Sequence, residues 1–222
     1  MLPQRNTNLY ARYLKRGSDI LFSFCGLVAL SPIILFFVAL IYFEMREGPF
    51  FVQERPGRHE KVFKLYKLKT MNNRTDAAGN LLPDRDRITR IGTFVRKTSI
   101  DEFPQLYNVF IGDMSLIGPR PLLVKYLPYY TERERLRHSV RPGITGLAQT
   151  SGRNTLSWDQ KFAKDLEYVE NLSLAMDLKI FFRTARKVLG QRDIVVDPTG
   201  NLVDLDDERR LRAMEQFTVA RS

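Results

Sequence analysis

Two adjacent carboxylates, Asp101 and Glu102, stand in the stretch SIDEFPQL at residues 99–106 of a 222-residue chain whose formal net charge is +10. Carboxylates can act as nucleophiles, and their hard oxygen atoms suit divalent cations. The same residues also fit a structural role, because Ser99-x-x-Glu102 matches a capping box at the start of a helix. Asp101 would then only be tolerated near the positive end of the helix dipole. Whether Asp101 and Glu102 form a catalytic pair or part of a helix cap must be judged from the surrounding sequence.

Basic residues surround this pair in the sequence and recur downstream. Arg96 precedes it, and Arg120 lies between Pro119 and Pro121, whose rings restrict the backbone and are expected to hold the arginine on a stiff segment. A rigid guanidinium is suited to gripping phosphate, although a plain turn explains the motif equally well when it stands alone. Further on, glycines lie between Arg141 and Arg153, but their spacing matches neither common nucleotide-binding glycine motif.

Residues 50–71 (FFVQERPGRHEKVFKLYKLKTM) are rich in β-branched and aromatic side chains around Pro56-Gly57. This pattern predicts a hairpin or extended structure with its turn at that dipeptide. The lysines of the segment, Lys67 among them, are spaced too irregularly to assign to one face. A solvated edge is the default interpretation, and anion binding is the alternative.

The apolar segment from Ile20 to Phe43 carries no charged residue and is long enough to reach across a bilayer, which takes about 20 residues. Ser31-Pro32 lies in its middle. Proline removes a backbone hydrogen bond and kinks a helix, and the neighbouring serine hydroxyl can serve the carbonyl that loses its donor. The segment is therefore either one kinked helix or a re-entrant hairpin of two halves, each about 12 residues or roughly 18 Å long.

Positive charge flanks this segment on both sides, with Arg5, Arg12, Lys15 and Arg16 before it and Arg46, Arg55, Arg58 and Lys61 after it. Cytoplasmic flanks of membrane segments are enriched in Lys and Arg, and one crossing cannot put both flanks on the same side. The residues alone leave re-entry and a single kinked crossing equally open.

Composition limits the remaining chemistry. The single cysteine, Cys25, excludes a disulfide framework within one chain, and two distant histidines give no zinc pattern. The basic excess predicts an anionic partner, which could be nucleic acid, an acidic membrane surface or a phosphorylated substrate. Residues 174–189 have the helical period of a basic amphipathic helix, which could pack on a core or lie in the membrane interface. The tail after Gly190 predicts a short helix and no nameable chemistry.

Several motifs in a fixed order resemble the bacterial sugar transferase family, and more narrowly the small monotopic polyprenyl-phosphate phosphoglycosyl transferases of the PglC type. They are KRGSD (15–19), the Ser31-Pro32 segment, RPG (55–57), KLYKLKTM (64–71), SIDEFPQLYNVFIGDMSLIGPRP (99–121) and RPGITGLAQTSGR (141–153). The similarity extends from about Lys15 to Leu189. Compared with larger family members, the chain resembles the minimal catalytic unit without extra N-terminal membrane helices.

The resemblance implies an α+β, mostly helical monotopic membrane protein. Its parts would be a cationic flank and a re-entrant, Ser-Pro-broken membrane helix (1–48), a catalytic domain with a small β element and interfacial amphipathic helices (49–190), and a tail (191–222). The enzyme would lie in the bacterial inner membrane with its catalytic domain on the cytoplasmic face, where anionic phospholipid, UDP-sugar and lipid phosphate meet.

The resemblance also assigns roles. Asp101 would attack the β-phosphate of a UDP-sugar, release UMP and pass the phosphosugar to polyprenyl (undecaprenyl) phosphate. Glu102, with Asp101, would hold Mg²⁺. Phosphate or nucleotide binding would fall to a basic and proline-flanked set: Lys67, Arg96, Pro119, Arg120, Pro121, Arg141 and Arg153.

Two questions stay open at this level. A UDP-N-acetylated sugar is the expected donor, with UDP-glucose or UDP-galactose as the alternative. A membrane-anchored basic module is the competing class of function; it predicts salt-sensitive nucleic-acid binding, for which no motif of interleaved aromatic and basic residues is present, so no nucleic-acid partner is expected. The oligomeric state cannot be inferred from the sequence.

Overall fold

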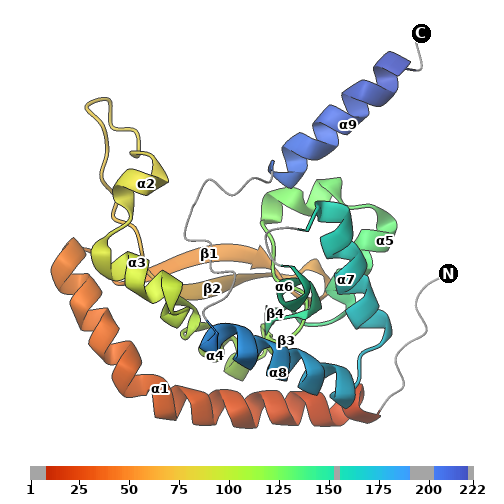
Figure 1. Cartoon of the computed structure of the whole chain (residues 1–222), viewed down its shortest axis with the longest axis horizontal. Helices are drawn as coiled ribbons and strands as arrows, with labels where there is room; N and C mark the ends of the chain where they lie inside the picture. Colours follow the sequence, from red (N-terminus) through yellow and green to blue (C-terminus); the bar gives the residue numbers. More distant parts are fainter. Residues whose placement is uncertain (1–8, 153–155, 191–202, 220–222) are drawn as a thin grey trace.

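The computed structural model describes residues 9–152, 156–190 and 203–219 (Figure 1). The longer helices are α1 (Lys15–Met45), α3 (Arg90–Lys97), α7 (Trp158–Glu170), α8 (Leu174–Leu189) and α9 (Leu205–Val219). Shorter ones are η1 (Tyr10–Leu14), η2 (Arg58–Glu60), α2 (Asp84–Arg87), η3 (Ile100–Glu102), α4 (Gln105–Ile111), η4 (Val124–Tyr129), α5 (Glu132–Arg135), η5 (Leu136–Ser139) and α6 (Leu147–Ser151). The strands are β1 (Phe50–Pro56), β2 (Val62–Leu68), β3 (Ser115–Ile117) and β4 (Gly143–Thr145).

The strands form two small sheets within this helical frame. β1 and β2 make the expected antiparallel hairpin, with Phe50 opposite Leu68 and Pro56 opposite Val62. β3 and β4 pair in parallel, although long stretches of chain separate them in the sequence. The mostly helical α+β prediction is confirmed, and the described parts include a hairpin and a helix at residues 174–189 where the sequence predicted them.

Helix α1 is one bent helix rather than two separate halves. Its hydrogen bonding continues from Lys15 to Met45 through Pro32, and Figure 1 shows it turning sharply midway around the underside of the molecule. Pro32 cannot donate to the carbonyl of Val28, and the hydroxyl of Ser31 donates to that oxygen instead at 2.8 Å. The serine therefore satisfies the carbonyl that the proline leaves without a donor, as its position in the sequence suggested.

Within the described residues, α1 alone is long and apolar enough to cross a membrane, and only 6% of its most apolar stretch is buried by the rest of the protein. Both of its ends attach to the same body. At its second end, Ile41 and Met45 pack around Leu68 of β2. The bend therefore brings the helix back towards the body from which its first residues start (Figure 1).

The first turns of α1 are attached by charged side chains. Lys15 donates to Asp177 of α8 at 2.6 Å and to the carbonyl oxygen of Ile117 at 3.0 Å. The buried carboxylate of Asp19 accepts from the Ser115 hydroxyl and the Leu116 amide, each at 3.0 Å. These bonds tie the apolar helix to α8 and β3.

Arg16 supplies a third attachment, at the end of α4. Its guanidinium donates to the carbonyl oxygens of Val109 at 2.6 Å and Phe110 at 2.8 Å, in the last turn of that helix. Terminal carbonyls of a helix lack intrahelical donors, and a cation there also complements the helix dipole. The KRGSD motif thus positions α1 under α4, the helix that follows the carboxylate pair.

Helix α8 turns an apolar face away from the protein. Ile180 is fully buried, whereas four large apolar side chains on its other faces are exposed: Leu174, Leu178, Phe181 and Phe182. Figure 1 shows α8 beside the first half of α1. The helix therefore packs on the core through Ile180, as one of the two interpretations expected, and leaves a second apolar face open.

The tail beyond residue 190 contains α9, longer than the short helix expected from the sequence. Trp158 of α7 donates to the carbonyl oxygen of Val203 at 3.0 Å, and Leu205 is buried in the cluster around Trp158 and Phe162. The first residues of α9 are held there, and the rest of the helix projects away from the body (Figure 1). Residues 191–202 and 220–222 lie outside the described residues.

Gly92 lets α3 pack directly on the backbone that follows β2. A Cβ atom at this position would lie 1.9 Å from the carbonyl oxygen of Thr70. Gly92→Ala is therefore expected to displace α3 and to destabilise the protein by about 1–3 kcal/mol or more. It should also lower activity, because Arg96 lies on the same helix. Thermal unfolding and enzyme assays would measure both effects.

The matched control is Gly17→Ala in α1, where no atom lies within 4 Å of the added Cβ. This substitution should leave the stability unchanged or raise it by up to about 1 kcal/mol, because alanine is the better helix former. A Gly92→Ala protein that unfolds at the wild-type temperature would contradict the close contact between α3 and Thr70.

Candidate active site

Asp101 and Glu102 lie in the short helix η3 between α3 and α4. The predicted capping box is wrong. Ser99 adopts a left-handed backbone conformation with φ of 58° and its side chain caps no amide, while α4 begins only at Gln105, after Pro104. Glu102 is drawn away from the backbone by cations that lie far from it in the sequence.

The Glu102 carboxylate binds two of the predicted basic residues. Its Oε1 accepts from Lys67 Nζ at 2.7 Å and from Arg120 Nη2 at 3.1 Å. Burial alone would raise the pKa of Glu102, but the charges of Arg120 and Lys67 outweigh burial and lower this pKa to about 2. Glu102 is therefore ionised at neutral pH, with its second oxygen outside these two bonds.

Asp101 has a different environment from its neighbour. Its side chain is only 13% exposed, its nearest ion-pair partner is Lys67 Nζ at 4.0 Å, and no hydrogen bond from the described residues reaches its oxygens. Burial raises the pKa of Asp101 to about 6, and the charge of Glu102 adds to that rise, while Lys67, Arg120 and Arg96 oppose it. A carboxylate that is poorly solvated and weakly hydrogen-bonded is more reactive as a nucleophile.

Arg96 is the third cation near the pair, after Lys67 and Arg120. It lies in the last turn of α3 and donates to the neutral hydroxyl of Thr70 at 2.8 Å. Its charge acts on Asp101, but it forms no ion pair with a carboxylate within the described residues. Its positive charge is therefore left for an anion outside the chain.

The backbone of the Pro-Arg-Pro motif is fixed by the parts of the chain around it. The amide of Gly143 in β4 donates to the carbonyl oxygen of Pro119 at 2.9 Å. The carbonyl oxygen of Arg120 accepts from Arg137 at 2.7 Å, and Arg137 also binds the buried carboxylate of Asp165 at 2.7 Å. Removing one partner of such a buried pair leaves an uncompensated charge, so the pair fixes the backbone of Arg120 strongly.

Two further cations lie near Arg120, and the sequence analysis did not identify them as site residues. Arg55 donates to Pro121 O at 3.4 Å, while its Nε is buried without a partner among the described residues. Burial and the charge of Arg120 lower its pKa to about 10. Lys161 lies over the Trp158 ring, 4.6 Å from its centroid, and burial and then Arg120 lower its pKa as well.

These two cations have no ion-pair partner among the described residues, and like charges so close together are stabilised by an anion. A signal was available in the sequence for Lys161. It lies on α7 between Trp158 and Phe162, so a charge stands beside the apolar face of an amphipathic helix. For Arg55, the first residue of the RPG motif, no sequence pattern indicated the contact with Pro121 that the structure shows.

For two of the predicted binding residues, the described structure shows no position beside Asp101 and Glu102. Arg141 donates through its Nε to the carbonyl oxygen of Gly112 at 2.8 Å, and its charged neighbours are Arg16 and Asp19 near the start of α1. Arg153 lies outside the described residues. The set that does converge is Asp101, Glu102, Lys67, Arg96 and Arg120, with Pro119 and Pro121 flanking the last.

The pair offers donors that fit a divalent cation. Carboxylate oxygens are the ligands that Mg²⁺ prefers. The oxygens of Asp101 accept no hydrogen bond within the described parts of the chain, and one oxygen of Glu102 is free of the two bonds that hold the other. Two carboxylates with open oxygens meet the requirement for one or two protein ligands beside substrate phosphates.

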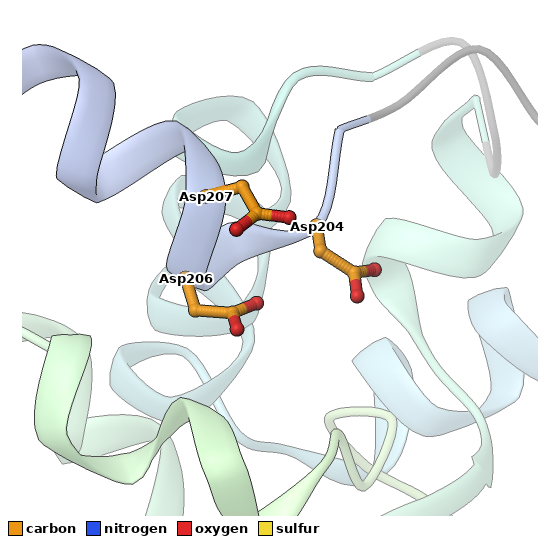
Figure 2. A group of neighbouring side chains, drawn as sticks. All are labelled: Asp204, Asp206 and Asp207. Carbon is orange, nitrogen blue, oxygen red and sulfur yellow. The ribbon is translucent and has the colours of Figure 1, made fainter.

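A second cluster of carboxylates lies at the start of α9 (Figure 2). Oxygens of Asp204, Asp206 and Asp207 approach within 4.8 Å of one another. Lys125 pairs with two of the three, with its Nζ 2.6 Å from Asp204 and 3.2 Å from Asp206. The cluster therefore anchors α9 to η4 and has no evident part in the chemistry of the pair.

Comparison with known proteins gives consistent matches over this same region. A sequence profile of the bacterial sugar transferase family matches residues 10–191. The "Uncharacterized sugar transferase EpsL" of Bacillus subtilis is 53% identical over 176 residues, which are 79% of this chain and 87% of that protein.

Two larger proteins also match. The undecaprenyl-phosphate galactose phosphotransferase of Salmonella typhimurium is 39% identical over 198 residues, 81% of this chain and 41% of that protein. The UDP-N-acetylgalactosamine-undecaprenyl-phosphate N-acetylgalactosaminephosphotransferase of Aeromonas hydrophila is 38% identical over 193 residues, 82% of this chain and 44% of that protein. The chain thus spans less than half the length of these two relatives.

Asp101 should make the metal-free protein less stable as the pH rises from about 4 to about 6. Its pKa is 3.8 in model compounds and about 6 in the folded protein, so in this interval the folded chain binds more protons than the unfolded one. The difference corresponds to about 3 kcal/mol at neutral pH. Asp101→Asn removes this penalty and is expected to raise the melting temperature by several degrees at pH 8, and by much less at pH 4.

The measurement is thermal unfolding of both proteins in chelator over this pH range. Asp84→Asn serves as the control, because Asp84 is exposed in α2. Equal melting temperatures of wild type and Asp101→Asn at pH 8 would mean that burial does not raise the pKa of Asp101.

Proposed function

The chain belongs to the bacterial sugar transferase family, and from this we propose that it is a phosphoglycosyl transferase that moves a sugar phosphate from a UDP-sugar to a polyprenyl (undecaprenyl) phosphate and releases UMP. The observation that carries the proposal is the contrast within the pair. Asp101 is buried and weakly bound, whereas Glu102 is held ionised by Lys67 and Arg120. The names of the Salmonella and Aeromonas relatives support the same donor and acceptor classes.

In the first step, an oxygen of ionised Asp101 attacks the β-phosphorus of the donor. A bond from Asp101 to phosphorus forms, and the bond from that phosphorus to the bridging oxygen breaks. UMP leaves with the bridging oxygen and its electron pair, and the phosphosugar remains on Asp101. Arg120 and Lys67, fixed beside the pair, stabilise the charge on the transferred phosphoryl group.

In the second step, an oxygen of the polyprenyl phosphate attacks the phosphorus of the phosphoaspartyl sugar. The bond to Asp101 breaks and the carboxylate is regenerated. Both attacking groups are anionic oxygens, so neither step needs a base to remove a proton from the nucleophile. This suits a site in which cations, rather than a histidine base, surround the reacting carboxylate.

We propose that Glu102 and Asp101 hold Mg²⁺ during turnover. When bound, Mg²⁺ would neutralise charge on the donor diphosphate. Glu102 suits this task because its low pKa keeps it ionised while Lys67 and Arg120 fix its orientation. Asp101 would be the second carboxylate to hold the metal.

We propose that α1 enters and leaves the bacterial inner membrane on the cytoplasmic face. Support comes from its bend at Pro32, from the attachment of both its ends to one body, and from the basic flanks on either side. The exposed apolar face of α8 would rest on the same anionic membrane surface, as proposed for an interfacial amphipathic helix. A UDP-sugar and a lipid phosphate can both reach such a site.

The donor is proposed to be a UDP-N-acetylated sugar, with UDP-galactose or UDP-glucose as the alternative. The relatives support both classes, since one is named for galactose and another for N-acetylgalactosamine. A panel of UDP-sugars assayed for UMP release would separate them.

Purified protein with a UDP-sugar and Mg²⁺ should release UMP in an amount comparable to the enzyme when no acceptor is present, and should turn over when polyprenyl phosphate is added. Intact-mass measurement should find one sugar phosphate added to the chain. Asp101→Asn should lose both the adduct and turnover, because an amide is a poor nucleophile for phosphorus. Asp84→Asn is expected to behave as wild type. Substantial turnover by Asp101→Asn would remove Asp101 from the nucleophile role.

Lys161 should contribute to donor binding, since its charge faces Arg120 without a carboxylate partner among the described residues. Lys161→Met is expected to raise the KM for the UDP-sugar about tenfold, the effect of losing one charge-assisted contact, with a smaller change in kcat. Lys164→Met is the matched control on α7, because Lys164 already pairs with Glu167 at 2.7 Å. Equal KM values for the two variants would contradict this role.

A further inference from the structure

Helix α9 begins where the elements that position Arg120 and Lys161 meet. Its first residue, Leu205, is fully buried in a cluster with Tyr126 of η4 and Trp158 of α7. The rings of Tyr126 and Trp158 lie edge to face, with their centroids 5.5 Å apart. Leu205 therefore packs at the junction of η4 and α7.

Polar contacts bind the start of the tail helix to η4 as well. Asp204 accepts from the Tyr126 hydroxyl at 2.9 Å, and its carboxylate pairs with Lys125 Nζ at 2.6 Å. η4 is the first helix after the Pro-Arg-Pro motif, so these contacts hold the chain that leads out of Arg120. The tail therefore supports the segment of the arginine that binds Glu102.

Trp158 is the link between α9 and Lys161. Its Nε1 donates to the carbonyl oxygen of Val203, just before α9, at 3.0 Å. Lys161 lies over the same ring, with its Nζ 4.6 Å from the centroid, and such cation–π contacts hold a charge at the face of a ring. The charges of Arg120 and of Glu208, on α9, both act on Lys161. The contacts that orient the indole therefore also set where the charge of Lys161 lies.

Two ion pairs at the surface extend this attachment. Arg209 and Arg212 of α9 pair with Asp159 of α7 at 3.2 Å and 2.9 Å. Asp159 is exposed, and pairs of this kind contribute little to stability. The outer part of α9 projects from the body (Figure 1), and Leu211 is 54% exposed. The attachment therefore depends mainly on the buried contacts of Leu205.

We propose that Asp204 and Leu205 are positioning residues for donor binding. By holding η4 and α7 together, they keep Lys161 close to Arg120. Like charges repel, so a site that is preorganised before its anion arrives needs a scaffold that resists their separation. The inference rests on the proposed function and adds the tail to the donor side of the same site.

A purely stabilising role for α9 is the competing explanation, since any buried leucine contributes to folding. The two roles predict different kinetics. A positioning residue changes the KM for the UDP-sugar through Lys161, whereas a general loss of structure lowers kcat and affects both substrates.

The first test compares steady-state kinetics of full-length variants. Leu205→Ala is expected to raise the KM for the UDP-sugar about fivefold, part of the effect of losing Lys161, and to leave the KM for polyprenyl phosphate within about twofold of wild type. Asp204→Ala should act in the same direction by about twofold to threefold. Leu205→Met keeps the apolar volume and should restore the wild-type KM.

A double-mutant cycle connects the tail to Lys161. If Leu205 acts through Lys161, Leu205→Ala should change the KM for the UDP-sugar by less than about twofold in a Lys161→Met protein. Two independent effects would instead multiply.

Trp158 is the only tryptophan of the chain, so its fluorescence reports this junction directly. An Asp101→Asn protein is expected to bind the UDP-sugar without transferring its phosphosugar, and the titration should change the emission of Trp158. Adding Leu205→Ala to this protein should raise the half-saturating concentration about fivefold. This measurement does not depend on catalysis.

Leu211→Ala is the matched control, because Leu211 lies on the same helix and is exposed. It should leave both KM values within about twofold of wild type. Melting temperatures would identify any misfolded variant, and Asp204→Ala keeps the test valid if Leu205→Ala does not fold.

The inference is wrong if folded Leu205→Ala has the same KM for the UDP-sugar as Leu211→Ala, or if the KM values for both substrates rise together. It is also wrong if the effects of Leu205→Ala and Lys161→Met multiply. A wild-type protein that binds the UDP-sugar but never releases UMP would instead refute the proposed function. The fluorescence titrations would then still decide whether Leu205 positions the UDP-sugar site, so the two failures are distinguishable.

Discussion

The structure depends on how an apolar helix is fastened to a polar body by three charged residues in its first turns. Lys15, Arg16 and Asp19 each reach a different element, namely α8, the end of α4, and β3. Only 6% of the most apolar stretch of α1 is buried against the body, so these hydrogen bonds and charge pairs contribute strongly to its position. Helix α4 follows the carboxylate pair, and β3 leads into the Pro-Arg-Pro motif. The same attachments therefore fix the position of α1 relative to the residues of the site.

The site itself is governed by an excess of positive charge. Glu102 compensates Lys67 and Arg120, but Arg96, Arg55 and Lys161 have no carboxylate partner among the described residues. The mutual repulsion of these positive charges is strongest when no anion is bound, and a bound anion reduces it. Substrates that carry several phosphate charges therefore gain binding energy from charges that destabilise the free protein. The basic composition of the chain is, in this part of the fold, a property of the site.

The sequence predicted the features that depend on local chemistry. The hairpin around Pro56-Gly57, the amphipathic helix at residues 174–189 and the help that Ser31 gives beside Pro32 all follow from short patterns. The capping box was a local pattern that tertiary contacts overrode, since Glu102 binds Lys67 from a strand 35 residues away. Contacts such as Arg137 with Asp165 could not be predicted, because they join separate helices at a distance of 28 residues. The resemblance assigned roles to the pair and to a set of cations, but it did not show which of these residues meet in the fold.

The bend at Pro32 links the membrane segment to the chemistry. A straight helix of 31 residues would be about 46 Å long and would carry Ile41 and Met45 away from Leu68. With the bend, those residues return to β2, and the second half of α1 passes close to α3 and η3. Pro32 then becomes part of an apolar groove that also includes Ile100, the residue before Asp101. One backbone feature therefore sets both the course of the apolar helix and the apolar surface that lies beside Asp101, so the two properties are coupled in this fold.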